Sequence, residues 1–281
     1  MHSVERMRPM LGTFVSIQAT GSDRVSPECI QAAIDSAFRA VARVDLLMSV
    51  HRYRSDIGRL NRCRPGASVL VHRWTYQVLT QAQTLRRDSG GTFDCNVGKS
   101  LRKAGLLPKR CGAAAVSLRK SGITMTLRPH CRVGVARSLS LDLGGIAKGF
   151  AVDQAVQVLQ AHRMISGVVN AGGDLRTFGQ AAQPIWRRCT SDPSTAEPIG
   201  HLQNGAIATS APYFTHHKQR VNSYSSAIVN PKTNAFCAIP NSISVIARTG
   251  MLADALTKIA AIRGQLPRRL ARHANARLVG T

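Results

Sequence analysis

A glycine-rich segment at 141–150, LDLGGIAKGF, has the composition of an anion-binding turn. It predicts a strand that ends at Asp142, a turn at Gly144 and Gly145, and a helix with Lys148 in its first turn. Such a turn presents backbone N–H groups and the positive end of a helix to an anion, with a cation close by. It is not a P-loop, because the G-x-x-x-x-G-K-[ST] spacing is absent. Alone, the segment also fits a simple strand–helix connection.

Four further segments carry more glycine and polar residues than packing alone would ask for. They are 90–98 (GGTFDCNVG), 168–176 (VVNAGGDLR), 208–211 (ATSA) and 253–257 (ADALT). Each also has a plain structural interpretation. The Gly-Gly-Asp run fits a turn or bulge with a capping acid, and the acid at Asp254 fits the positive N-terminal end of a helix.

Together and in this order, the five segments resemble the ApbE family of FAD:protein FMN transferases. Two more stretches extend the resemblance over nearly the whole chain. Residues 8–13 (RPMLGT) are similar to the family's opening motif, and 48–52 (MSVHR) with 55–61 (SDIGRLN) are similar to its next block. Any one of these motifs occurs often by chance, whereas seven in register do not.

The resemblance implies a transferase that takes FAD as its substrate. Members of the family hold a magnesium ion on the FAD pyrophosphate, move FMN onto a Thr or Ser hydroxyl of an acceptor flavoprotein, and release AMP. The nucleophile then comes from the acceptor protein. The resemblance also implies a single domain over 1–281, with a basic C-terminal tail from about 264.

The same resemblance assigns site residues. Asp254 and the backbone carbonyl of Gly145 are the expected magnesium ligands, with the Thr257 hydroxyl as a third candidate, and magnesium prefers such oxygen ligands. Asp254 and Asp142 are the expected catalytic residues. The positions expected to contact FAD are Met10, His51, Thr92, Phe93, Asp94, Asp142, Lys148 and Val229.

Three positions depart from the family's pattern. Lys258 stands where the family has a Thr, four residues after the metal-binding acid. The family's His-x-x-Asp-Pro segment is AIVNP at 227–231, so Ala227 replaces a plausible base, and His51 stands where a Tyr is common. If Lys258 points outward, Thr257 and Gly145 complete the metal site. If it points inward, it pairs with Asp254 in place of the cation. We expect the first.

These departures keep two alternative functions open. The chain could bind FAD without transferring FMN, which the changes at Ala227 and Lys258 favour. It could also hydrolyse FAD as a pyrophosphatase, with water in place of the protein hydroxyl.

The elements that must position these residues follow from periodicity and end signals. Ser26, Pro27 and Glu28 start a helix over 26–47, whose apolar stripe, including Phe38, should pack on a sheet and have only a structural role. Further helices are expected over 74–87, 147–162 and 252–262. Strands are expected over 14–19, 168–169 and 243–247, a hairpin over 123–135 and a surface loop over 180–198. Mixed strands and helices without a regular βαβ repeat predict an α+β fold.

Composition narrows the functional classes. The chain has 38 Lys and Arg against 14 Asp and Glu, a formal charge of +24. Such a field attracts polyanions, but the basic residues are scattered with little aromatic interleaving. Nucleic acid is therefore not the expected partner, whereas a small dinucleotide would suit this charge.

Cysteine usage and hydropathy predict a cytoplasmic protein. Seven cysteines are an odd number without a C-x-x-C pair, which favours reduced thiols over a disulfide framework or a zinc site. The first ten residues are polar and charged, unlike a signal peptide. No run approaches the ~18 apolar residues of a membrane span.

Overall fold

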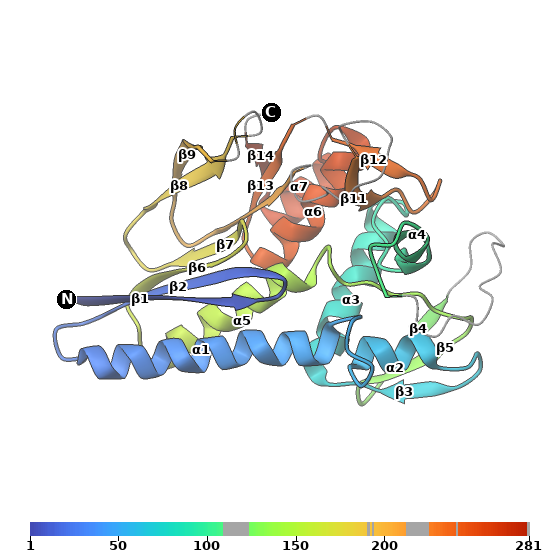
Figure 1. Cartoon of the computed structure of the whole chain (residues 1–281), viewed down its shortest axis with the longest axis horizontal. Helices are drawn as coiled ribbons and strands as arrows, with labels where there is room; N and C mark the ends of the chain where they lie inside the picture. The colour runs from blue at the N-terminus through green and yellow to red at the C-terminus, as the bar shows by residue number, and fades with distance from the viewer. Residues whose placement is uncertain (109–123, 190–191, 193, 212–224, 240, 280–281) are drawn as a thin grey trace. The chain divides into compact units, whose positions relative to one another are not determined.

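The computed structural model describes residues 1–108, 124–189, 192, 194–211, 225–239 and 241–279 (Figure 1). The chain divides into two compact units. Unit 1 comprises 1–43, 146–228 and 237–281, and unit 2 comprises 44–145 and 229–236. Helices and antiparallel sheets are mixed along the chain, so the predicted α+β class is confirmed. The single domain over 1–281 stays a prediction.

Unit 1 contains a seven-stranded sheet in the order β1-β2-β6-β7-β10-β13-β14. Each neighbouring pair is antiparallel. The strands are β1 (His2–Met10), β2 (Thr13–Gly21), β6 (Ser166–Ala171), β7 (Asp174–Phe178), β10 (Ala206–Ser210), β13 (Ile243–Ala247) and β14 (Arg277–Val279). Burial alternates along β2, where Val15, Ile17 and Ala19 face the core. This is the pattern that period-two patterning predicts for a half-buried strand.

Helices α5 (Ala147–Ala161) and α6 (Gly250–Arg263) pack on this sheet and on each other. Helix α1 (Pro27–Met48) begins where its end signals predict, and the division between the units falls within it after Arg43. Phe38 of α1 is 1% exposed, with the Arg8 guanidinium carbon 4.4 Å from its ring centre. The expected burial of the α1 stripe is therefore confirmed.

Two segments of unit 1 have more regular structure than the sequence predicted. The surface loop expected over 180–198 is wrong, because β8 (Gln183–Arg188) and β9 (Ala196–Leu202) form an antiparallel hairpin with a bulge at Ile185 and Trp186. The basic tail is part of the fold. It forms α7 (Arg268–Ala274) and then β14, which pairs with β13.

Unit 2 contains α2 (Asp56–Arg62), α3 (Arg73–Asp88), α4 (Gly98–Lys103) and a three-stranded sheet. Its strands are β3 (Ser68–Leu70), β5 (Arg132–Val135) and β4 (Met125–Arg128) in that order, so the predicted hairpin is confirmed apart from residue 123, which lies outside the described residues. A separate two-stranded ribbon, β11 (Ser225–Val229) with β12 (Phe236–Ala238), carries the 229–236 loop that belongs to unit 2. No helix of the described chain is long and apolar enough to cross a membrane.

Candidate functional site

The starts of α5 and α6 meet at two glycines in unit 1. A Cβ atom on Gly149 would lie 2.0 Å from the carbonyl oxygen of Gly250, and one on Gly250 would lie 2.6 Å from the carbonyl oxygen of Gly149. Both distances are far shorter than a van der Waals contact. The two positions therefore accept only glycine, and this is what lets the helix ends approach so closely.

Two carboxylates bind these helix ends reciprocally. Asp153 of α5 accepts hydrogen bonds from the backbone N–H groups of Gly250 at 2.8 Å and Met251 at 2.9 Å. Asp254 of α6 accepts one from the N–H of Gly149 at 3.2 Å. The first N–H groups of a helix lack partners within the helix and carry partial positive charge, so each carboxylate stabilises the other helix's start.

Lys258 points inward and pairs with Asp254. Its Nζ lies 2.5 Å from Asp254 Oδ1 and 3.1 Å from Thr257 Oγ1, and Asp254 is fully buried. The preferred expectation, an outward Lys258, is therefore wrong. The i, i+4 spacing on one helix face brings the two side chains together, and a buried carboxylate without a counter-charge would be costly.

The hydroxyl of Thr257 has its hydrogen-bonding capacity filled. It donates to the carbonyl oxygen of Asp254 at 2.7 Å. Because its single proton is used there, it accepts from Ser210 Oγ at 2.8 Å and from Lys258 Nζ at 3.1 Å. A hydroxyl has one proton and two lone pairs, so no lone pair of Thr257 remains for a metal ion.

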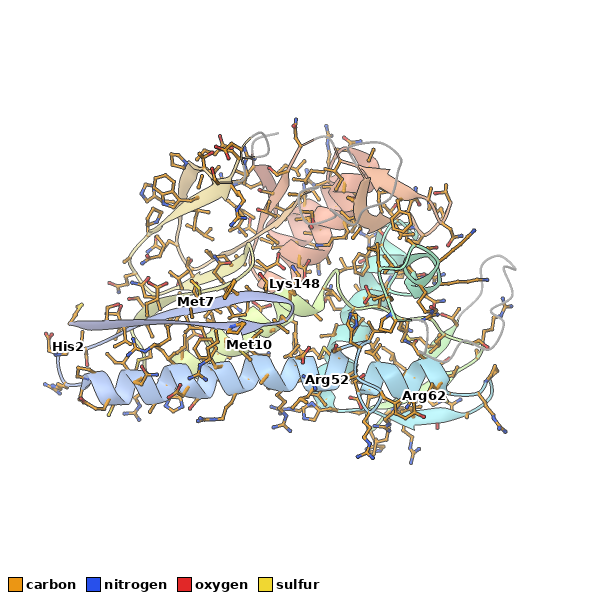
Figure 2. All side chains as sticks on the ribbon, in the orientation of Figure 1. His2, Met7, Met10, Arg52, Arg62 and Lys148 are labelled. Atoms are coloured by element: carbon orange, nitrogen blue, oxygen red, sulfur yellow. The ribbon has the colours of Figure 1, made fainter. Side chains whose placement is uncertain are left out.

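A second ion pair lies at the start of α5. The Gly172-Gly173 turn joins β6 to β7 and places Asp174, 1% exposed, beside the Lys148 ammonium, with which it forms an ion pair. The turn predicted at Gly172-Gly173 is confirmed. Both glycines have positive φ, and Asn170 Oδ1 accepts a hydrogen bond from Gly173 N–H at 2.9 Å. Asp174 Oδ1 has no hydrogen-bond partner among the described residues. Lys148 itself is 32% exposed and is labelled in Figure 2.

The buried charges of this region balance. A third pair joins Arg176 Nη1 to Asp153 Oδ1 at 2.7 Å. Three carboxylates and three cations therefore lie in the cluster, which we call the α5/α6 charge cluster: Asp153, Asp174, Asp254, Lys148, Arg176 and Lys258. Its formal charge is zero before any ligand binds.

Electrostatics shift the pKa values of three of these groups. Burial raises the pKa of Asp153, although its ion pair with Arg176 and the helix N–H groups oppose the shift. Burial also raises the pKa of Asp174, and the negative charge of Asp254 adds to it. Burial alone would lower the pKa of Lys148, but the carboxylates of Asp174 and Asp254 raise it well above its ordinary value. Lys148 is therefore a persistent cation.

In unit 2, the segment before the glycine turn belongs to no strand or sheet, so the strand expected to end at Asp142 is wrong. Backbone hydrogen bonds to 95–98 and side-chain amides hold the segment instead: Asp142 N–H donates to the Cys95 carbonyl at 2.8 Å, and Gly98 N–H donates to the Ser140 carbonyl at 2.8 Å. Asn61 donates to the Leu141 carbonyl at 2.9 Å and accepts from the Leu141 N–H at 2.6 Å, and Asn96 accepts from Ser140 N–H at 2.7 Å. Asp142 Oδ2 accepts from Gly144 N–H at 3.2 Å, which holds the turn that Gly145 closes.

The 92–94 loop of unit 2 is also tightly bonded. Thr92 and Phe93 are 3% and 5% exposed, and Thr92 Oγ1 donates to the Ser89 carbonyl at 3.0 Å. Asp94 accepts from Arg86 Nε at 2.7 Å and from Asn96 N–H at 2.9 Å. The carboxylate therefore holds the loop in shape and pairs with a cation of α3.

The remaining expected FAD contacts lie on short or exposed segments. Met10 ends β1 in unit 1 and is partly exposed. His51 lies in unit 2 just after α1 and is exposed, whereas Val229 ends β11 and is 6% exposed. Their role in FAD binding stays a prediction.

A family model described as the ApbE family matches residues 11–278. The chain belongs to the ApbE family. Among its relatives are proteins named FAD:protein FMN transferase from Treponema pallidum, 27% identical over 222 residues, and from Vibrio cholerae, 26% identical over 274 residues. These alignments cover 73% and 92% of this chain, and 61% and 80% of the two relatives. The chain thus spans 61% of the Treponema pallidum protein.

Solved ApbE structures share the fold. The ApbE protein of Thermotoga maritima superposes with a TM-score of 0.79 at 27% identity, covering 99% of this chain and 93% of that one. The flavin transferase ApbE of Vibrio cholerae gives a TM-score of 0.76 at 23% identity, covering 100% and 94%. The resemblance seen in the sequence is therefore confirmed, and so is the α+β fold.

Four residues that the structure of this ApbE chain brings into the site were not among the predicted site residues. Asp153, Asp174, Arg176 and Ser210 all contact expected site residues or each other. One signal could have found Asp153. It is a single acid among apolar residues of α5, in the run AVDQAV at 151–156, where burial without a counter-charge would be too costly.

Proposed function

We propose that this chain transfers FMN from FAD to a Thr or Ser hydroxyl of an acceptor flavoprotein and releases AMP. The match of the ApbE family model over 11–278 carries the proposal, and the relatives named FAD:protein FMN transferase support it. The partly exposed, persistent cation at Lys148 suits a diphosphate substrate.

The reaction is a substitution at the FMN-side phosphorus of FAD. The acceptor oxygen forms a bond to this phosphorus while the bond from the same phosphorus to the bridging oxygen breaks. The bridging oxygen and its electron pair leave with AMP, and the hydroxyl proton is released. Negative charge develops on phosphoryl oxygens, so fixed cations and N–H donors accelerate such a step.

The proposed FAD contacts are those that the family resemblance assigns. In unit 1 they are Met10 and Lys148, and in unit 2 they are His51, Thr92, Phe93, Asp94, Asp142 and Val229. The proposed catalytic residues are Asp254 of unit 1 and Asp142 of unit 2. Lys148 has the clearest role, because its ammonium is charged, partly exposed and held by Asp174 at a helix start.

Position 227 supplies no base for the attacking hydroxyl. Ala227 lies in β11 and is exposed, and its methyl group cannot take a proton. This feature also favours the second candidate, an FAD-binding protein that does not transfer FMN.

Magnesium fits the described residues poorly. Of its expected ligands, Thr257 has no free lone pair and Asp254 already pairs with the Lys258 ammonium. No step of the proposed reaction is accordingly assigned to a metal ion.

Incubation with FAD and a flavoprotein domain that carries an exposed acceptor Thr tests the proposal. The mass of the acceptor should increase by one FMN, and replacement of that Thr by Val should abolish the increase. Free FMN with an unmodified acceptor would instead indicate FAD hydrolysis. Bound FAD that survives intact would indicate the binding protein.

A further inference from the structure

We infer that the Lys258 ammonium occupies the place of a divalent cation, so that this chain binds FAD without a metal ion. The inference takes FAD as the ligand from the proposed function. It depends on two contacts of the Lys258 ammonium within α6 and on the charge balance around them.

The ammonium lies where a cation bridging Asp254 and Thr257 would lie. Its Nζ is 2.5 Å from Asp254 Oδ1 and 3.1 Å from Thr257 Oγ1, two oxygens of the set expected to hold the metal. An ammonium has three N–H donors, and these contacts use two. The third has no acceptor within the described part of the chain, and the side chain is 18% exposed. This N–H can donate to a phosphoryl oxygen of FAD.

Charge excludes a second cation at the same position. The α5/α6 charge cluster already holds three carboxylates and three cations. A divalent ion on Asp254 would lie within a few ångström of the Lys258 ammonium and would give the FAD-free cluster a net charge of +2. Like charges so close in a poorly solvated site repel strongly. The ammonium and the metal are therefore alternatives.

The wild-type protein alone provides the first test. FAD affinity is measured from flavin fluorescence in EDTA and in excess magnesium, and binding of Mn²⁺ to the FAD-free protein is followed by electron paramagnetic resonance. We expect the same FAD dissociation constant within about twofold in both buffers, since a factor of two is less than a single weak hydrogen bond, and no tight Mn²⁺ site. The inference would be overturned if the protein bound one equivalent of Mn²⁺ that magnesium displaces, and if FAD binding were lost in EDTA.

Lys258→Thr is the complementary test, because it removes the ammonium and restores the family's residue. In EDTA, Asp254 is left buried without its counter-charge, so Tm should fall by roughly 6–12 °C and FAD should bind about 10- to 100-fold more weakly. Magnesium should restore both, and a Mn²⁺ signal should appear. A variant that shows no response to either metal would contradict the argument.

Lys103→Thr is the matched control. It makes the same chemical change and the same change in net charge at an exposed end of α4, so its Tm and FAD affinity should equal those of the wild type with and without metal. The proposed function and the role of Lys258 can be refuted independently of each other. Metal-independent FAD binding with no FMN on any acceptor would refute transfer while leaving the role of Lys258 intact.

Discussion

Gly149→Ala tests the close crossing of α5 and α6, on which the geometry of the site depends. Helix propensity alone predicts stabilisation by about 1 kcal/mol, because alanine is favoured over glycine in a helix interior. The structure predicts the opposite sign. The new Cβ would lie 2.0 Å from the Gly250 carbonyl oxygen, 2.4 Å from its carbonyl carbon and 2.8 Å from Met251 N, and all three are backbone atoms that no rotamer change can move away.

The size of the effect follows from these contacts. The helices must separate by roughly 1.5 Å to reach an ordinary contact, and overpacking of this kind costs about 1–3 kcal/mol. Separation also weakens the 3.2 Å hydrogen bond from Gly149 N–H to Asp254, and a bond to a charged group contributes about 1.5–3 kcal/mol. We expect a net loss of about 2–4 kcal/mol in the free energy of unfolding.

Urea unfolding at constant m-value provides the measurement. Ala32→Gly, at an exposed position of α1, is the control for propensity and should lose only about 1 kcal/mol. A Gly149→Ala protein as stable as the wild type, or more stable, would refute the close approach of the two helices.

Three further predictions follow from single side chains. Lys148→Ala should weaken FAD binding by about 1–3 kcal/mol in calorimetry, the range for loss of a charge-assisted hydrogen bond, and unchanged affinity would remove Lys148 from the site. Phe38→Ala should cost about 3–5 kcal/mol of stability and leave the FAD affinity of the folded fraction unchanged, because Phe38 is buried in the core of unit 1. The pKa of Lys148 is raised on folding, so the folded state holds this proton more tightly than the unfolded chain. Its contribution is complete below pH ~10.5 and is lost above it. The stability advantage of the wild type over Lys148→Met should therefore stay constant from pH 7 to about 10 and decrease at higher pH, whereas a constant difference up to pH 11.5 would contradict the assignment.

Local end signals explain why most of the helices were predictable. Pro27 and Glu28 begin α1 as expected, and the alternation in 243–247 coincides with β13. The hairpin of β8 and β9 was missed because its pairing depends on the partner strand, and a polar, proline-containing run gives no local alternation. The segment before Gly144 was predicted as a strand for a related reason. Its apolar residues are buried, but its hydrogen bonds go to the side chains of Asn61 and Asn96 and to the 95–98 loop, not to a neighbouring strand.

The motifs of the site could be predicted from the sequence, whereas the pairing of its charged side chains could not. The sequence placed Asp254 and Lys258 four residues apart and left two orientations open, because a helical spacing does not say which face is buried. The structure buries this face, and burial requires a partner for each carboxylate. The same requirement brings Lys148 to Asp174 and Arg176 to Asp153, pairs that join separate elements and so leave no signal in spacing.

The ratio of AMP released to flavin bound on the acceptor, measured in EDTA, tests the central claim most directly. Transfer of FMN from FAD predicts one AMP for each flavin that remains on the acceptor after denaturation, with FAD consumed in equal amount. AMP in excess over bound flavin would indicate hydrolysis. FAD that stays intact with the acceptor unmodified, both in EDTA and in magnesium, would contradict the proposal that this chain transfers FMN.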